Sequence, residues 1–359
     1  MLHPPSDHPF VLLDPAPYPC PPLQNSLPSS STMRSLSAAA PRQFGPRRAS
    51  QSVERSPELM DGISRQSRLI HNTSKHINEG FFGRSENIQA IERRHSLEKE
   101  FDIGSVVGKG NFSQVRIAIR RRDDKKCALK EIAKRSLRGK WFFVENEVEV
   151  LAGASHANIC QLIDAFQTDN FYYLFFEFAQ DGDVFEVVRR RGRLEEREAA
   201  RVLQQTASAL AYLHANSIAH RDVKPENLLL FGNWKVKLAD FGLACTVLGP
   251  LTRICGTPTY CAPEIVTQLG YGIPVDLWSL GVVMHVVLSG TAPFRAADRA
   301  GLFRAIARAQ LRLHSTPWML ISSDAKELLR QLLTADPSAR ISSSRVLSHP
   351  WILPRSAQI

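Results

Sequence analysis

A glycine-rich segment and a lysine on the strand expected after it are the first residues of the chain equipped to bind phosphate. Residues 108–115 read GKGNFSQV, and glycines there let backbone amides approach an anion without an intervening Cβ. Lys130 lies in an otherwise apolar run, where an ammonium group needs an anionic partner to offset its desolvation. Glu147 or bound phosphates could be that partner. Taken singly, a tight hairpin and a surface lysine on an edge strand also explain these residues.

Three further motifs follow in a fixed order. HRDVKPEN occupies residues 220–227, DFG occupies 240–242 after an expected apolar strand at 236–239, and APE occupies 262–264. The first motif fits H-R-D-L-x-x-x-N with valine in place of leucine. An arbitrary chain has little chance of carrying all three in this order at workable spacings, so we interpret them as parts of one catalytic domain.

The elements that must position these motifs change character along the chain. Residues 115–119 alternate apolar and basic side chains, which predicts a half-buried strand, and 127–132 and 171–178 are expected as further strands. Residues 144–151 have helical spacing, and an amphipathic helix is expected from 196 to 214. The sequence therefore predicts an α+β fold, with a small strand-rich part before a larger, mainly helical part.

These motifs resemble those of eukaryotic protein kinases, and the resemblance covers residues 101–351. Within that family the chain is most similar to the calcium/calmodulin-dependent group, especially the doublecortin-like kinases, through residues 138–140, 146–148, 249–251 and 255–260. The resemblance implies a bilobal kinase domain at 101–352, with a small antiparallel sheet lobe at 101–178 and a helical lobe at 179–352. Residues 353–359 would form a short tail.

The resemblance also implies catalytic roles for matching positions. Asp222 would accept the proton of the substrate hydroxyl, and Lys224 would steady the phosphate being moved. Asn227 and Asp240 would offer oxygen ligands to Mg²⁺, a cation that prefers such hard donors. The expected cofactors are therefore ATP and Mg²⁺.

Lys130, held by Glu147, would grip the inner phosphates of ATP, and Phe176 would narrow the rear of the nucleotide pocket. Backbone groups of Glu177 and Ala179 would bind the adenine. The positions that the resemblance assigns to ATP binding are Val107, Gly108, Lys109, Gly110, Asn111, Phe112, Ser113, Gln114, Val115, Ala128, Lys130, Glu147, Glu177 and Ala179.

Other matching positions bear on the substrate. The run 224–226 and the run 256–258 have the form found in kinases that act on serine and threonine. Asp183 and Glu226 match carboxylates that contact basic residues ahead of the acceptor, so a preference for arginine near the target is expected. Helix capping or ribose binding is the alternative role for these two carboxylates.

Several matches are expected to be structural. Glu264 and Arg340 correspond to a buried ion pair that anchors the activation segment, and Asp276 would hold the catalytic loop backbone. A hydrophobic stack between the lobes would comprise Leu151, His220 and Phe241.

The activation segment departs from the family pattern. Relatives often carry a phosphate-accepting threonine two residues before the cysteine of the CGTP run, where this chain has Arg253. Thr252, one residue earlier, is the candidate phosphoacceptor. Arg221 would normally attract such a phosphate. The sequence leaves open whether Thr252 serves or whether the enzyme is active without modification.

Composition limits the class of protein. The 359 residues are 43% hydrophobic with a formal charge of +10, and the pI is about 9.5. No aromatic residues interleave the basic runs 120–122 and 189–191, so nucleic-acid binding is not expected. Six cysteines without C-x-x-C spacing indicate reduced thiols in the cytoplasm or nucleus. We expect no secretory signal, no membrane span and a monomer whose partners are protein substrates with serine or threonine acceptors.

The proline- and serine-rich residues 1–95 lack apolar periodicity and are expected to be disordered. They contain two basic-serine motifs, at 47–50 and 93–96, and no room for a doublecortin domain. Residues after Trp351 are too few for a calmodulin-binding helix of about 20 residues, so calmodulin control is not expected. Two other functions remain open: a pseudokinase, and a scaffold or microtubule-associated protein acting through its basic tail.

Overall fold

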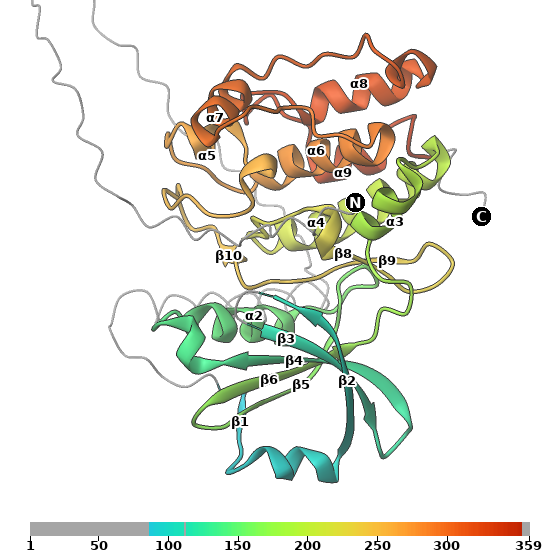
Figure 1. Ribbon diagram of the computed structural model, residues 1–359. Helices are drawn as coiled ribbons and strands as arrows, with labels where there is room; N and C mark the ends of the chain where they lie inside the picture. Colours follow the sequence, from blue (N-terminus) through green and yellow to red (C-terminus); the bar gives the residue numbers. More distant parts are fainter. Residues whose placement is uncertain (1–85, 111–112, 354–359) are drawn as a thin grey trace, which may run out of the picture. The chain divides into compact units, whose positions relative to one another are not determined.

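The computed structural model describes residues 86–110 and 113–353 (Figure 1). A six-stranded sheet precedes the helical part, in the order β1-β5-β6-β4-β3-β2. The pairing is antiparallel throughout except between β1 and β5. The strands are β1 (Gln89–Ala90), β2 (Phe101–Lys109), β3 (Ser113–Arg120), β4 (Lys125–Ala133), β5 (Leu162–Gln167) and β6 (Phe171–Glu177). The expected α+β architecture is confirmed.

Alternation along β6 gives the sheet two apolar faces. Leu174 packs beneath helix α2 (Phe142–Gly153), in a cluster with Val144 and Val148. The next residue, Phe175, belongs to the cluster on the opposite face, where its ring stacks on that of Phe101 at a centroid distance of 3.8 Å. Because successive strand side chains point to opposite faces, a continuous aromatic run suits a strand covered on both sides.

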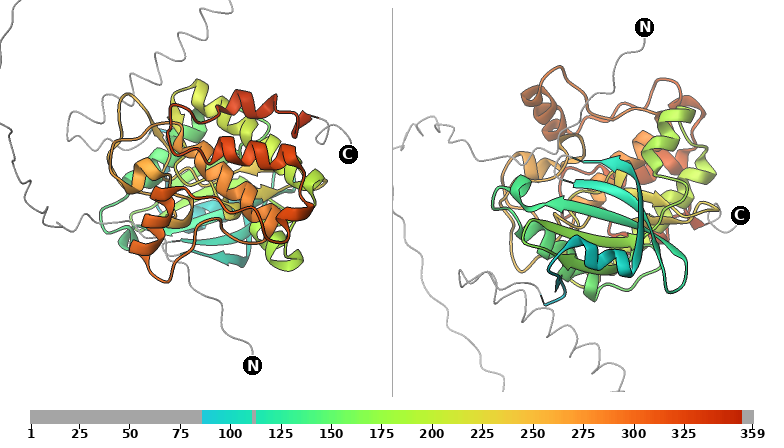
Figure 2. Two further views of the ribbon diagram at one scale, coloured as in Figure 1. Left: turned by 90° about the horizontal axis from the view of Figure 1, so that it is seen from above. Right: turned by 60° about the horizontal axis from the view of Figure 1, so that its bottom comes forward.

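The segment before the sheet corrects one expectation. Residues 86–95 were expected to be disordered, but β1 pairs with Phe166 and Gln167 of β5, and η1 (Arg94–Lys99) follows it. Ile88 and Leu97 are buried in the two clusters of the sheet, at 5% and 2% exposure. The right-hand view of Figure 2 shows this blue segment against the strands. The apolar area buried by these two side chains stabilises an otherwise polar stretch. Residues 1–85 lie outside the described part.

The helical part surrounds a second, larger core. Its helices are α3 (Val184–Arg191), α4 (Glu196–Ala215), α5 (Pro263–Val266), α6 (Val275–Ser289), α7 (Arg299–Arg308), α8 (Ser323–Leu332) and α9 (Ser343–Leu347). A capping box formed by Glu195 and Glu198 begins α4. It supplies acceptors to backbone N–H groups at the start of the helix, which have no partner within the helix. Nearly every residue of α6 is buried, so it is the central helix against which α4 and α8 pack.

Short strands carry the loops that join the two parts. β7 (Ile218–Ala219) pairs with β10 (Cys245–Thr246), and β8 (Leu228–Leu230) pairs with β9 (Val236–Leu238). η3 (Pro225–Asn227) lies between β7 and β8, and η4 (Pro258–Tyr260) precedes α5. The loops that carry the HRD and DFG motifs are therefore flanked by short, hydrogen-bonded strands. None of the helices in the described ranges has the length and apolar character needed to cross a bilayer.

Candidate active site

A residue of α6 binds the backbone of the loop that carries Asp222. Asp276, fully buried near the start of that helix, accepts hydrogen bonds from the backbone N–H groups of His220 at 2.9 Å and Arg221 at 2.8 Å. Its Oδ2 also contacts His214 Nε2 at 2.9 Å. Arg221 has a φ of 67°, a left-handed conformation that a non-glycine residue adopts only where its surroundings impose it. The expected role of Asp276 in holding this loop is present in the structure.

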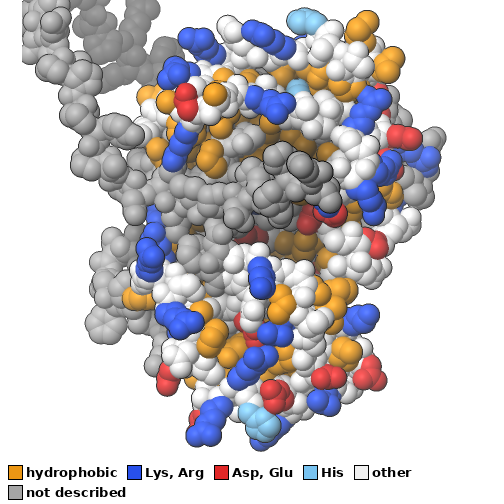
Figure 3. All heavy atoms as spheres, viewed as in Figure 1, with side chains coloured by type: hydrophobic (Ala, Val, Ile, Leu, Met, Phe, Trp, Pro, Cys, Tyr) orange, Lys and Arg blue, Asp and Glu red, His pale blue; other side chains and the backbone are white. Residues whose placement is uncertain are grey.

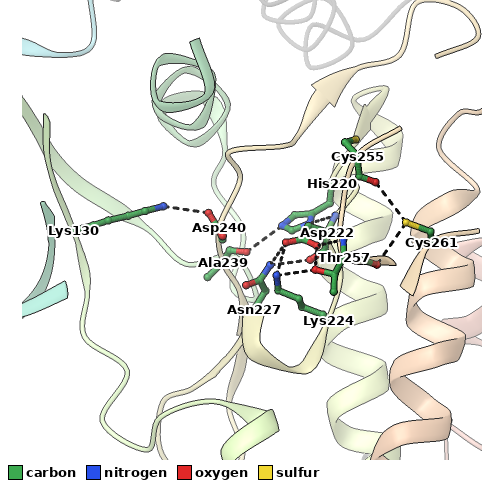
Figure 4. Close-up of polar contacts among 10 residues, drawn as sticks. All are labelled: Lys130, His220, Asp222, Lys224, Asn227, Ala239, Asp240, Cys255, Thr257 and Cys261. Carbon is green, nitrogen blue, oxygen red and sulfur yellow. Dashed lines mark hydrogen bonds and ion pairs between the residues drawn. The ribbon is translucent and has the colours of Figure 1, made fainter. Parts of the chain in front are cut away.

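The Asp222 carboxylate is oriented by three residues, two from its own loop and one from the activation segment (Figure 4). Lys224 Nζ donates to Oδ2 at 2.7 Å, and Thr257 donates to Oδ1 through its hydroxyl at 2.8 Å and its backbone N–H at 3.1 Å. Asn227 Nδ2 adds a contact of 3.2 Å and also binds the Asp222 backbone carbonyl at 2.8 Å. Asp222 is 3% exposed. A buried carboxylate fixed in this way is suited to accept a proton from a positioned hydroxyl.

Lys130 on β4 contacts two carboxylates, one on helix α2 and one in the DFG motif. Its Nζ lies 2.8 Å from Glu147 Oε2 on α2 and 3.2 Å from Asp240 Oδ1. Burial alone would lower the pKa of Lys130, but the charges of Asp240 and Glu147 raise it above its ordinary value. Lys130 therefore stays positively charged, as its expected role in binding phosphates requires.

Asp240 remains an anion in this setting. Burial would raise its pKa, but Lys130 and Lys224 lower it below the ordinary range. The residue has a φ of 63°, which strains a non-glycine backbone and presents the carboxylate beside Lys130.

The donor set at the site fits Mg²⁺. Asn227 uses its amide nitrogen for the Asp222 loop, so its amide oxygen is the group that can ligate a cation together with Asp240. Mg²⁺ is usually held by one or two protein oxygens while it keeps waters and phosphate ligands. In residues 86–110 and 113–353, no group of three or more His, Cys, Asp or Glu side chains is placed to hold a metal.

The glycine-rich segment forms the hairpin between β2 and β3. Gly110 N–H donates to Ser113 O at 2.8 Å, and a Cβ on Gly110 would lie 3.1 Å from the Ser113 hydroxyl. Gln114 pairs with Lys109 and Val115 with Gly108 across the two strands, and Val107 is 53% exposed. Asn111 and Phe112 lie outside the described residues.

The remaining positions assigned to nucleotide binding lie on β4 and at the end of β6. Ala128 pairs with Phe176, and Glu177 ends the strand just ahead of Ala179. The Glu177 side chain binds Lys237 Nζ and accepts from Gln161 N–H at 2.7 Å, so its carboxylate has a structural role. Figure 3 shows a hollow between the sheet and the helical part, with acidic and hydrophobic side chains along its wall.

The features expected to be structural are present. The rings of His220 and Phe241 meet edge to face at 4.8 Å, and Phe241 shares its buried cluster with Leu151. Arg340 Nη1 lies 2.7 Å from Glu264 Oε1. The aromatic contact joins the catalytic loop to the DFG motif, and the ion pair joins the APE motif to Arg340.

The structure adds two contacts that sequence reasoning missed. Thr257, noted only for the form of its motif, binds both Asp222 and Lys224. Asn146 Nδ2 donates to the backbone carbonyl of Ala244 at 2.6 Å and so ties α2 to the segment after the DFG motif. Only the position of Asn146 one residue before Glu147 could have indicated it.

The two carboxylates expected to read basic residues have different surroundings. Asp183 caps α3 by accepting a hydrogen bond from Glu186 N–H at 2.8 Å. Helix capping is one of the alternative roles expected for this carboxylate. Glu226 is mostly buried, and this burial raises its pKa. Its Oε2 has no hydrogen-bond partner within the described part of the chain. A buried acceptor of this kind is costly unless a donor arrives to pair with it.

Comparisons with known proteins agree with this geometry. The family described as "Protein kinase domain" matches residues 101–352. Serine/threonine-protein kinase DCLK3 of Mus musculus is 42% identical over 262 residues, which cover 71% of this chain and 33% of the relative. DCLK1 of Rattus norvegicus is 39% identical over 75% of this chain and 64% of its own. DCLK2 of Homo sapiens is 40% identical over 73% and 35%, respectively. The chain thus spans between about a third and two thirds of the length of these relatives.

Proposed function

The chain belongs to the protein kinase family, and from this premise we propose that it transfers the terminal phosphate of ATP to serine or threonine hydroxyls of proteins. The observation that carries the proposal is the orientation of Asp222 by Lys224, Thr257 and Asn227, together with the contact between Asp240 and Lys130. The relatives above have serine/threonine-protein kinase in their names.

Each residue has a distinct part in the proposed reaction. Asp222 orients the substrate hydroxyl and takes its proton as the oxygen bonds to the terminal phosphorus, while the bond from that phosphorus to ADP breaks and ADP leaves. Lys224, next to Asp222, offsets negative charge on the phosphate that moves, and Lys130 holds the inner phosphates. Asn227 and Asp240 would hold magnesium, which when bound neutralises phosphate charge. The buried pairing of Lys130 with Glu147 keeps the cation in place before a nucleotide arrives.

The substrate preference follows from the unpaired carboxylate oxygen. Glu226 lies two residues after Lys224, and its buried Oε2, which has no hydrogen-bond partner in the described part of the chain, would gain one from a guanidinium ahead of the acceptor. Asp183 already caps α3, so Glu226 is the stronger candidate of the two. We propose that the protein favours substrates with arginine before the serine.

Phosphate transfer from ATP to an arginine-serine peptide, with Asp222→Asn as the matched variant, tests the reaction. Loss of a positioned base lowers such rates about 10²- to 10⁴-fold. Asp123→Asn, in a surface turn, serves as the control and should retain the wild-type rate. Equal and negligible transfer by all three proteins would favour a pseudokinase. Transfer to tyrosine alone would contradict the proposed substrate class.

Glu226→Gln tests the arginine preference separately. The variant should raise KM for the arginine-serine peptide roughly tenfold, because it removes a charge-assisted hydrogen bond. It should leave KM unchanged for the peptide with alanine in place of arginine. An equal change for both peptides would indicate a general disturbance of the loop and overturn the assignment of Glu226.

A further inference from the structure

The activation segment carries an arginine where relatives often carry a phosphate-accepting threonine. Arg253 is exposed, and its backbone carbonyl accepts a hydrogen bond from the Tyr271 hydroxyl at 2.6 Å. Tyr271 also pairs with Leu251 through the backbone, so this stretch has a fixed path. The Arg253 side chain is thereby presented from an anchored backbone.

That side chain lies on the first turn of α2. The Arg253 guanidinium carbon is 5.6 Å from the ring centroid of Phe142 and 5.3 Å from that of Phe143. The two rings are adjacent to each other, with centroids 4.1 Å apart. A cation within about 6 Å of an aromatic face is attracted by the quadrupole of the ring. Arg253 thus contacts both aromatic residues that open the helix.

The same helix carries the residue that holds Lys130. Glu147 lies one turn after Phe143, on the same side of α2, since positions i and i+4 share a face. Asn146 is bonded to Ala244 at the other end of the activation segment. Helix α2 is therefore fastened to this segment at two points, by Asn146 and by Arg253.

The cation that would attract a phosphate is already engaged. Arg221 donates to the Leu243 carbonyl at 2.6 Å and to the Tyr271 hydroxyl at 3.2 Å. Within residues 86–110 and 113–353 no carboxylate forms an ion pair with it. The Tyr271 hydroxyl accepts from Arg221 and donates to the Arg253 carbonyl, and so links the catalytic loop to the activation segment through neutral groups.

We propose that Arg253 is a positioning residue that holds α2 against the activation segment through Phe142 and Phe143, so that the Glu147–Lys130 pair forms without a phosphate on Thr252. This inference rests on the proposed kinase activity. It decides between the two alternatives that the sequence leaves open. Arg253 acts through α2 and touches neither substrate nor nucleotide.

The test compares turnover of the full chain with and without phosphate on Thr252. Protein treated with phosphatase, verified by mass spectrometry, and the Thr252→Ala variant should both keep kcat within about twofold of the untreated protein. Arg253→Gln should lower kcat about three- to tenfold, the rate equivalent of one or two cation–π contacts, with peptide KM unchanged. Arg253→Lys should restore most of the loss because it keeps a cation.

A second set of variants checks that the loss passes through the aromatic rings. Phe143→Leu should lower kcat by a similar factor, and the double variant with Arg253→Gln should lose little more than either alone. Hydrogen exchange of the backbone amides gives a readout besides activity. Exchange in the first turns of α2 should rise in Arg253→Gln and stay at the wild-type rate in Arg253→Lys.

Two results would overturn the proposal. One is a loss of kcat of tenfold or more in Thr252→Ala, or on phosphatase treatment, while Arg253→Gln matches the wild type. The other is unchanged α2 exchange in Arg253→Gln. If every protein, wild type included, transfers no more phosphate than Asp222→Asn, the proposed kinase activity fails, and the exchange experiment still decides whether Arg253 holds α2.

Discussion

Glu264 and Arg340 form a two-point ion pair inside the helical part. Nη1 of Arg340 lies 2.7 Å from Oε1 of Glu264, and Nη2 lies 3.0 Å from Oε2. The remaining donors of the guanidinium reach backbone carbonyls, among them those of Thr334 and Pro274. The pair therefore links the end of the activation segment to the segment after α8.

Arg340→Leu is expected to destabilise the domain by about 3–5 kcal/mol, because it leaves the Glu264 carboxylate buried without its cation. Urea unfolding at neutral pH measures the change. Arg189→Leu also removes a bidentate ion pair, with Glu186, but this pair is exposed to solvent. The variant should lower the free energy of unfolding by less than about 1 kcal/mol. Similar losses in both variants would contradict the importance given to burial.

A methyl group added at Gly281 of α6 should destabilise the core. Its Cβ would lie 2.8 Å from the Cβ of Leu332 and 2.9 Å from Cδ2 of Leu333, so a packed helix would have to move. Overpacking costs about 1–3 kcal/mol, against about 1 kcal/mol gained from the better helix propensity of alanine. Gly249→Ala, where a Cβ meets nothing within 4 Å, is the matched control. We expect a lower midpoint in denaturant for the first variant only.

His285 should make the domain sensitive to acid. Burial lowers the pKa of its imidazole from 6.5 to about 4, while its Nδ1 contacts the Thr291 carbonyl at 2.7 Å. The unfolded chain takes up a proton as the pH falls below 6.5, whereas the folded chain resists until about pH 4. Stability present above pH 6.5 is therefore lost on acidification, on the order of 3 kcal/mol in full.

The unfolding free energy of wild type and His285→Gln, measured from pH 7 to pH 4, checks this expectation. The variant should show the shallower dependence on pH. His314→Gln removes an exposed imidazole and should follow the wild-type curve. Parallel curves for the wild type and His285→Gln would show that His285 is not the group that responds.

Glu147→Gln should weaken the hold on Lys130. The change replaces a charged acceptor, 2.8 Å from the ammonium, with a neutral amide. Hydrogen bonds to charged groups contribute about 1.5–3 kcal/mol, so kcat/KM for ATP should fall roughly 10- to 150-fold. Peptide KM should stay constant. An unaltered kcat/KM for ATP would mean that Asp240 alone suffices to position Lys130.

Local sequence signals predicted the parts of the fold that carry their own periodicity. The strand expected at 171–178 is β6 (Phe171–Glu177), and the helix expected at 196–214 is α4 (Glu196–Ala215). Of the site residues that the motifs predicted, Lys130 contacts Asp240 and Asn227 contacts Asp222, while their roles in catalysis stay predictions. Alternation, amphipathic spacing and fixed motifs are properties of residues close together in the sequence, so they can be recognised without knowing the tertiary structure.

What escaped prediction depends on contacts between distant segments. The strand β1 has two residues, too few for any alternation, and its pairing with β5 depends on the burial of Ile88. The contact of Arg253 with Phe143 joins positions 110 residues apart and requires the path of the activation segment. Neither the pairing of β1 nor the contact of Arg253 can be predicted from the residues adjacent to it in the sequence.

The placement of η1 has a practical consequence for protein production. Arg94 of η1 lies 3.2 Å from Glu131, and Leu97 fills the cluster around Phe101. A recombinant fragment that begins at Phe101 would lose the buried Leu97 side chain. It would also lose Arg94, a cation that pairs with Glu131, which is only 4% exposed. It would also bare β5 as a sheet edge to which another chain can add. Fragments for crystallisation should therefore start upstream of residue 86.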